Sequence, residues 1–144
     1  MLAHGRDRLG EVPTALWCGV IDAETLRVPQ RAEEVPALPG IRNQDRAVGG
    51  SNYYHDLGAL VAFRALTEVT GEQVYARAAD DYTRDFLRLG QSPETGLLAW
   101  GEHLYYDVFR DRVAAERIHH EFLAGTPPWA QFHRIDPVAT AKAI

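Results

Sequence analysis

Cysteine is almost absent from this chain of 144 residues, in which Cys18 is the only thiol. A single thiol excludes an internal disulfide and a zinc site built from several thiolates. Long apolar runs are also missing, since no stretch approaches the roughly 20 apolar residues of a membrane span, and no membrane partner is expected. The first ten residues contain Arg6, Asp7 and Arg8 and lack the apolar run of a secretory signal. As written, the chain is therefore expected in the cytoplasm, and in the periplasm or outside the cell if its N-terminus is truncated.

Positive charge is in deficit, with 15 Lys and Arg against 20 Asp and Glu and a net charge of −5. Binding to nucleic-acid phosphates needs a basic face, so a nucleic-acid partner is not expected. The chain also lacks a phosphate-binding glycine loop that ends in Lys-Ser/Thr and a Gly-x-Ser-x-Gly nucleophile motif. What remains is an ordinary globular composition, 46% hydrophobic and 24% charged, in a chain long enough for one domain.

The chain divides into three parts within this single, partial domain. Residues 1–50 are punctuated by proline and glycine, and form an irregular segment too long to be a simple connector. Within it, the apolar run from Ala15 to Ile21 fits either a buried extended segment or a loop that packs under something larger. Residues 91–144 begin as a loop rich in aromatic residues and histidine, followed by starts of further helices at Pro127-Pro128 and Asp136-Pro137. Because the last helix has barely begun when the chain stops, we expect a fragment.

Residues 51–90 carry the clearest structural pattern. Ser51 or Asn52 can cap a helix in which apolar residues recur at spacings of three and four as far as Val69. After a Thr-Gly break, a second helix is predicted from Glu72 to Leu89. Two such helices joined by a short turn form an antiparallel hairpin.

Histidine and glutamate gather in the last third of the chain, in Trp100-Gly101-Glu102-His103 and in His119-His120-Glu121. Neutral imidazole and carboxylate suit divalent transition metals. The absence of cysteine ligands argues against a structural zinc site. Two histidines and one glutamate would leave positions open for water or substrate. By spacing alone, a polar loop whose side chains meet only solvent is the commoner explanation.

Aromatic side chains offer a second kind of site. Flat rings complement the C–H faces of sugars, and we expect Trp100, Tyr53 and Tyr54 to bind substrate. Trp17 and Trp129 are further candidates. The competing explanation is that tryptophans in a chain of this size belong to the core or to an interface.

Several segments, taken in order, resemble the N-terminal part of periplasmic-type pectate lyases of polysaccharide lyase family 2. They are the opening from Pro13 to Thr25, the hairpin that begins at Ser51-Asn52-Tyr53, the stretch from Gly96 to His103, and His120-Glu121. The resemblance covers most of this chain and a minor part of such an enzyme. It implies a mainly α fold, made of helical hairpins of an (α/α) toroid of the six-hairpin glycosidase-like class. The toroid would be incomplete here and preceded by the long irregular segment.

The same resemblance implies a cofactor and its ligands. Members of the family bind a divalent transition metal, manganese or a similar ion, with two histidines and one glutamate. His103 of Trp-Gly-x-His matches the first ligand, and Glu121 of His-Glu matches the carboxylate ligand. The second histidine and the catalytic arginine would lie beyond Ile144, so this chain is expected to lack the catalytic base.

The implied reaction is metal-assisted β-elimination on a polyuronate such as pectate, so the expected partner is an acidic polysaccharide or oligosaccharide. A glycoside hydrolase or sugar epimerase of the same toroid class is an alternative that needs an acid/base pair and no metal. A non-catalytic remnant that binds carbohydrate weakly is another. In each case an incomplete set of hairpins would expose an apolar face, which favours a homo-oligomer or another partner.

Overall fold

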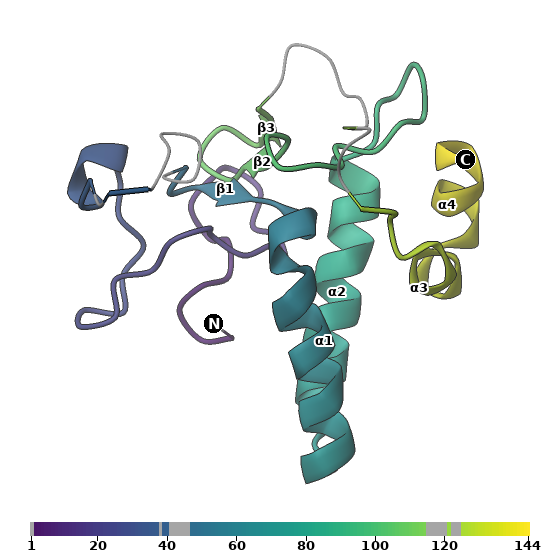
Figure 1. Cartoon of the computed structure of the whole chain (residues 1–144), viewed down its shortest axis with the longest axis horizontal. Helices are drawn as coiled ribbons and strands as arrows, with labels where there is room; N and C mark the ends of the chain where they lie inside the picture. The colour runs from purple at the N-terminus through teal and green to yellow at the C-terminus, as the bar shows by residue number, and fades with distance from the viewer. Residues whose placement is uncertain (1, 38, 41–46, 115–120, 122–124) are drawn as a thin grey trace.

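The computed structural model describes residues 2–37, 39–40, 47–114, 121 and 125–144. In this part of the chain helices predominate, as predicted for a mainly α fold (Figure 1). The α-helices are α1 (Tyr53–Thr70), α2 (Gln73–Leu89), α3 (Trp129–Ile135) and α4 (Pro137–Ala143). The remaining elements are a short 3-10 helix, η1 (Ala32–Glu34), and the strands β1 (Gly50–Ser51), β2 (Tyr106–Asp107) and β3 (Arg112–Val113).

Helices α1 and α2 form the predicted hairpin, and local hydrogen bonds explain where each one begins and ends. The side-chain oxygen of Asn52 accepts hydrogen bonds from the backbone N–H groups of Tyr54 and His55, at 2.9 and 3.3 Å. Asn52 is therefore the cap of α1, and the choice left open between it and Ser51 is resolved. Gly71 ends α1 with a φ of 76°, a left-handed conformation that glycine adopts without a side-chain clash.

A small antiparallel sheet lies across the end of the hairpin at which α1 begins and α2 ends (Figure 1). Its order is β1-β2-β3, with Ser51 opposite Tyr106 and Tyr106 opposite Val113. Strand β2 is a short extended piece within the aromatic loop. Residues 115–120 and 122–124 lie outside the described residues.

The core is built around aromatic rings from distant parts of the sequence. Tyr53 of α1 lies at its centre, with ring centroids of Phe86, Phe132, Tyr82 and Trp100 at 4.7, 5.0, 5.6 and 6.2 Å. Tilted and edge-on ring pairs at these distances stabilise a fold beyond simple burial of area. One cluster therefore joins α1, α2, α3 and the loop that follows α2.

The N-terminal segment also contributes buried residues to this core. Residues 15–18 are buried, and Trp17, fully buried, forms an antiparallel bridge with Arg6. The Trp17 ring lies 4.7 Å from Tyr82 and 5.0 Å from Phe63 between ring centroids. This part of the segment is thus both extended and packed against the hairpin.

The two short C-terminal helices begin where the sequence predicted. Pro128 precedes α3, and the Asp136 side chain caps α4 by accepting a hydrogen bond from the Ala139 backbone at 2.9 Å. Both helices lie beside α2 (Figure 1). No helix among the described residues is long and apolar enough to span a bilayer.

Candidate functional site

A single buried amide ties the start of α1 to the aromatic loop. The Nδ2 atom of Asn52 donates hydrogen bonds to the carbonyl oxygens of Gly101 and Glu102, at 3.0 and 3.1 Å. Its Oδ1 atom meanwhile caps α1, so both ends of the side chain are used. The Nε2 atom of His55 also lies 3.3 Å from the Glu102 carbonyl oxygen. The backbone just before His103 is therefore held in place against the helix.

Glu121 approaches the same loop from a distant part of the sequence. Its carboxylate oxygens accept hydrogen bonds from the backbone N–H groups of Glu102 and His103, at 2.8 and 3.0 Å. Its Oε1 atom lies 3.0 Å from Nδ1 of His103. Burial alone would raise the pKa of Glu121, but the hydrogen bonds from His103 and Glu102 outweigh it and lower that pKa. The two residues predicted as metal ligands are thus brought together, with the carboxylate ionised.

Gly101 makes room for this carboxylate. Its φ is 141°, and a Cβ atom at this position would lie 2.5 Å from the side-chain carbons of Glu121. Any other residue would push Glu121 away from the loop and strain the backbone. The close approach of Glu121 therefore explains why glycine occupies this position of the Trp-Gly-x-His motif.

His103 and Glu121 contact each other directly through a hydrogen bond or ion pair, and their donor types are also compatible with part of a ligand set for a divalent cation. Two donors about 2.1 Å from an ion and at right angles to each other lie about 3.0 Å apart, which matches the separation of His103 Nδ1 and Glu121 Oε1. Imidazole nitrogen with carboxylate oxygen also suits manganese-like ions. The described residues contain no group of three or more His, Cys, Asp or Glu side chains that could hold a metal. His119 and His120, which the sequence placed in the same cluster, lie outside the described residues.

A pocket of about 220 Å³ opens beside the loop. Its lining includes Asn52, His55 and Asp56 from the start of α1, with Glu102 and Tyr105 from the loop. Pockets with a few convergent polar groups are typical binding sites. The pocket and the His103–Glu121 pair are therefore joined through the backbone of Glu102.

Asp56 is the most unusual group in this pocket. Its Oδ2 atom accepts a hydrogen bond from the Tyr82 hydroxyl at 2.6 Å, and that hydroxyl lies 2.9 Å from Ser51 Oγ. Burial raises the pKa of Asp56 to about 6, although the hydrogen bond from Tyr82 and the charge of His55 act in the opposite direction. The sequence carries no signal that singles out Asp56, because an acidic residue in the first turn of a helix is expected from the helix dipole alone.

The aromatic residues predicted to bind substrate lie mostly in the core. Tyr53 is 0% and Trp100 2% exposed, and the indole N–H of Trp100 donates to the Gly125 carbonyl oxygen at 2.6 Å. Neither ring presents a face to a sugar in this structure, because protein covers both. Tyr54 is half-buried, edge-on to Trp100 and His55 at 5.6 Å in each case, and its contact with substrate stays a prediction.

Comparison with known proteins identifies the family. A family model described as periplasmic pectate lyase matches residues 42–144, a stretch that contains all four α-helices together with His103 and Glu121. A search of curated proteins finds no match to the chain. Since the family model covers well over half of the sequence, and agrees with the resemblance carried by its motifs, the chain belongs to the periplasmic pectate lyase family.

Proposed function

We propose that this chain supplies the metal-binding and substrate-binding platform for β-elimination on an acidic polysaccharide such as pectate. The observation that carries the proposal is the convergence of His103 and Glu121, 3.0 Å apart between Nδ1 and Oε1, inside the segment that matches the family. Following the description of that family, we place the activity in the periplasm. We do not assign to this chain the base that removes the proton.

His103 and Glu121 would hold a manganese-like ion. A bound divalent cation supplies electrostatic stabilisation of the negative charge that develops when a uronate loses the proton beside its carboxylate. The backbone N–H groups of Glu102 and His103 fix the direction of the Glu121 carboxylate, as outer hydrogen bonds do at many metal sites. Asn52 supports the site indirectly, because its side-chain amide donates hydrogen bonds to carbonyl groups of that loop.

The pocket at Asp56 is the proposed place of a sugar unit. Asp56 and Glu102 would repel the uronate carboxylate, which would therefore point toward the cation, while sugar hydroxyl groups donate to Asp56. The half-buried ring of Tyr105 offers an aromatic wall on the same pocket. The negative charges of Asp56 and Glu102 thus favour the substrate orientation in which the uronate carboxylate faces the cation.

We further propose that the α1–α2 hairpin is one unit of an (α/α) toroid. In a toroid each hairpin packs between neighbours, so its helices need apolar residues on more than one face. Helix α1 meets this requirement, since Val61, Leu66 and Val69 are 57%, 40% and 85% exposed on the side that α2 leaves free. A neighbouring hairpin, or a second copy of the chain, would cover them.

A second candidate function is favoured by Asp56. A carboxyl group with a pKa of about 6 in a pocket beside His55 has the properties of a general acid or base. Such a group would serve a glycoside hydrolase or sugar epimerase of the toroid class. This candidate differs from the first because it predicts activity that a chelator does not abolish.

The test is a calorimetric titration of the metal-free chain with manganese. We expect saturable one-to-one binding, lost in Glu121→Ala and weakened in Gly101→Ala, where the added methyl group displaces the carboxylate. Glu68→Ala, which removes an exposed carboxylate from α1, is the matched control and should bind as the original chain does.

Elimination is then followed on polygalacturonate by the ultraviolet absorbance of the unsaturated product. A folded chain that binds no manganese, or a Glu121→Ala variant that binds it normally, would contradict the metal platform. Glycan turnover that persists in chelator and is lost in Asp56→Asn would favour the second candidate.

A further inference from the structure

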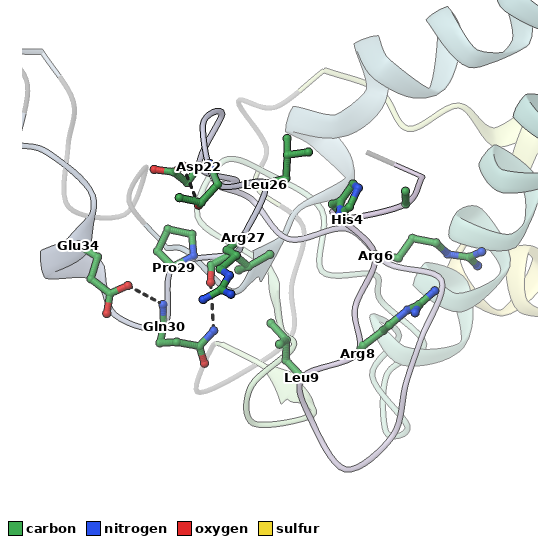
Figure 2. A pocket seen from close by; sticks show the side chains of 13 residues that line it. His4, Arg6, Arg8, Leu9, Asp22, Leu26, Arg27, Pro29, Gln30 and Glu34 are labelled. Atoms are coloured by element: carbon green, nitrogen blue, oxygen red, sulfur yellow. Dashed lines mark hydrogen bonds between the residues drawn. The ribbon is translucent and has the colours of Figure 1, made fainter.

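A larger cavity, of about 630 Å³, lies in the N-terminal segment (Figure 2). The start of the chain forms one wall and the turn at residues 22–27 forms another, with residues 28–30 and Glu34 along the rim. It shares no lining residue with the pocket at Asp56. It also lies entirely outside residues 42–144, the segment matched by the family. Whatever it binds is therefore separate from the His103–Glu121 site.

The turn that forms one wall holds a leucine in an unfavourable conformation. Leu26 has a φ of 55° and a side chain that leaves the residue 47% exposed. Backbone hydrogen bonds of 2.9 Å, from Leu26 to Asp22 and from Asp22 to Arg27, keep it there. A bulky residue at positive φ is rare, and strain of this kind concentrates at functional sites. Here it places an apolar side chain in the lining of the cavity, together with Leu9 and Pro29.

Three arginines whose side chains have no partner among the described residues line the same cavity. Arg6, Arg8 and Arg27 form no ion pair or side-chain hydrogen bond with the described part of the chain. Figure 2 shows the side chains of Arg6 and Arg8 extending away from the turn that carries Arg27, so that Arg27 is the arginine that lies beside Pro29 and Gln30. Several other arginines of the described chain are paired, among them Arg64 and Arg134 with Asp80.

The acidic groups near these arginines are already engaged. In the cavity, Asp22 accepts hydrogen bonds from the Thr25 backbone and hydroxyl at 2.6 and 2.7 Å, and Glu34 binds Arg31 at 3.2 Å. The carboxylates of Asp81 and Asp85, which line a neighbouring hollow with Arg6 and Arg8, pair with Arg84 and Arg88. None of these carboxylates forms an ion pair with Arg6, Arg8 or Arg27, so the guanidinium groups are available to an anionic ligand, while Asp22 remains an anion in the lining.

We propose that this cavity is a second binding site for acidic sugars, in which Arg27 binds a uronate carboxylate and Leu26 with Pro29 receive the C–H face of the ring. The planar guanidinium group matches a carboxylate with two parallel hydrogen bonds. The net charge of −5 opposes binding of a polyanion over much of the surface, so a local cationic site is needed to hold one. The choice of uronate as ligand rests on the proposed function.

The test is a calorimetric titration of the full chain with trigalacturonate in the presence of EDTA, which removes the metal-dependent site from the measurement. We expect saturable binding that Arg27→Ala weakens about tenfold, the loss typical of one charge-assisted hydrogen-bonded contact. Arg27→Lys should restore part of the affinity, and added salt should weaken binding. The matched control is Arg77→Ala, an exposed arginine of α2 outside the cavity, which should bind as the original chain does.

Leu26→Gly separates binding from folding. Glycine accepts the positive φ and removes the apolar side chain, so the melting temperature should not fall while the affinity for trigalacturonate does. No binding by the folded chain, equal binding of a neutral galactose oligomer, or displacement by equimolar inorganic phosphate would each overturn the acidic-sugar site. Because Arg27→Ala should leave manganese binding unchanged and Glu121→Ala should leave EDTA-resistant binding unchanged, the two proposals fail separately.

Discussion

The two ends of α1 are built from similar residues and have opposite surroundings. At its beginning, Tyr53 is 0% exposed, under the loops and the small sheet. Toward its end, Leu66 and Val69 are 40% and 85% exposed, where the hairpin extends away from the rest of the molecule (Figure 1). Apolar sequence therefore makes burial favourable, but burial occurs only where another element is present to cover the helix.

Polar groups show the same difference. At the covered end the side chains of Asn52, Ser51 and Tyr82 all have hydrogen-bond partners from other segments. At the far end Thr67 and Thr70 bond to nearby backbone atoms of the turn. Buried polar groups need partners, so the covered end is specified by long-range contacts and the far end by local ones.

The largest effect that this comparison predicts is the loss of a core ring. Tyr53→Ala removes a fully buried side chain that contacts four other aromatic rings, and should lower the free energy of unfolding by about 3–5 kcal/mol. Val69→Ala, at the exposed end of the same helix, should change it by less than about 0.5 kcal/mol. Urea denaturation followed by tryptophan fluorescence measures both. Equal effects of the two substitutions would show that the ends of α1 do not differ as described.

An intermediate effect concerns Asp56 and pH. Its pKa of about 6 in the folded chain lies above its ordinary value of 3.8, so the folded state binds this proton more tightly than the unfolded state. The resulting stabilisation is complete below about pH 4 and is lost as the pH rises to about 6, on the order of 2–3 kcal/mol. In Asp56→Asn this loss should disappear from urea denaturation curves recorded between pH 4 and 7.

Tyr82→Phe sharpens the same prediction. The Tyr82 hydroxyl donates to the ionised carboxylate and lowers the pKa of Asp56, so its removal should move the pH window upward. Other groups near Asp56 include His55, whose charge favours ionisation, and the buried thiol of Cys18, whose own pKa burial raises to about 11. Glu102 and Tyr105 line the same pocket. A pH dependence that is identical in Asp56→Asn and the original chain would assign it to another group.

The smallest effect on stability is expected at the exposed stripe of α1. Glutamine at Val61, Leu66 and Val69 should change the free energy of unfolding by less than about 0.5 kcal/mol per substitution, because little apolar area leaves a core. Self-association should nevertheless fall, since the stripe is the proposed contact with a neighbouring hairpin or a second copy. Sedimentation velocity over a range of concentrations measures this. A chain that is already monomeric at every concentration would contradict the association.

Local chemistry made much of the fold predictable. The ends of the hairpin depend on Asn52 and Gly71, and the start of α4 depends on Asp136, each acting on backbone atoms within a few residues. Several segments taken in order, including the one that ends at His103, indicated the family, which the comparison confirmed. Helix ends of this kind can be predicted from the sequence because the interacting groups are close along the chain.

Tertiary structure decided which of these residues are buried. Tyr53 and Trp100 are aromatic in the sequence, and only packing against α2, α3 and the loops makes them core residues. Asp56 acquires its raised pKa from burial beneath segments far away in the sequence, and Glu121 reaches His103 across a gap of 18 positions. Composition and motifs by themselves determined the helices and the family. Burial, charge state and the meeting of distant side chains required the folded chain, because each depends on what lies nearby in space.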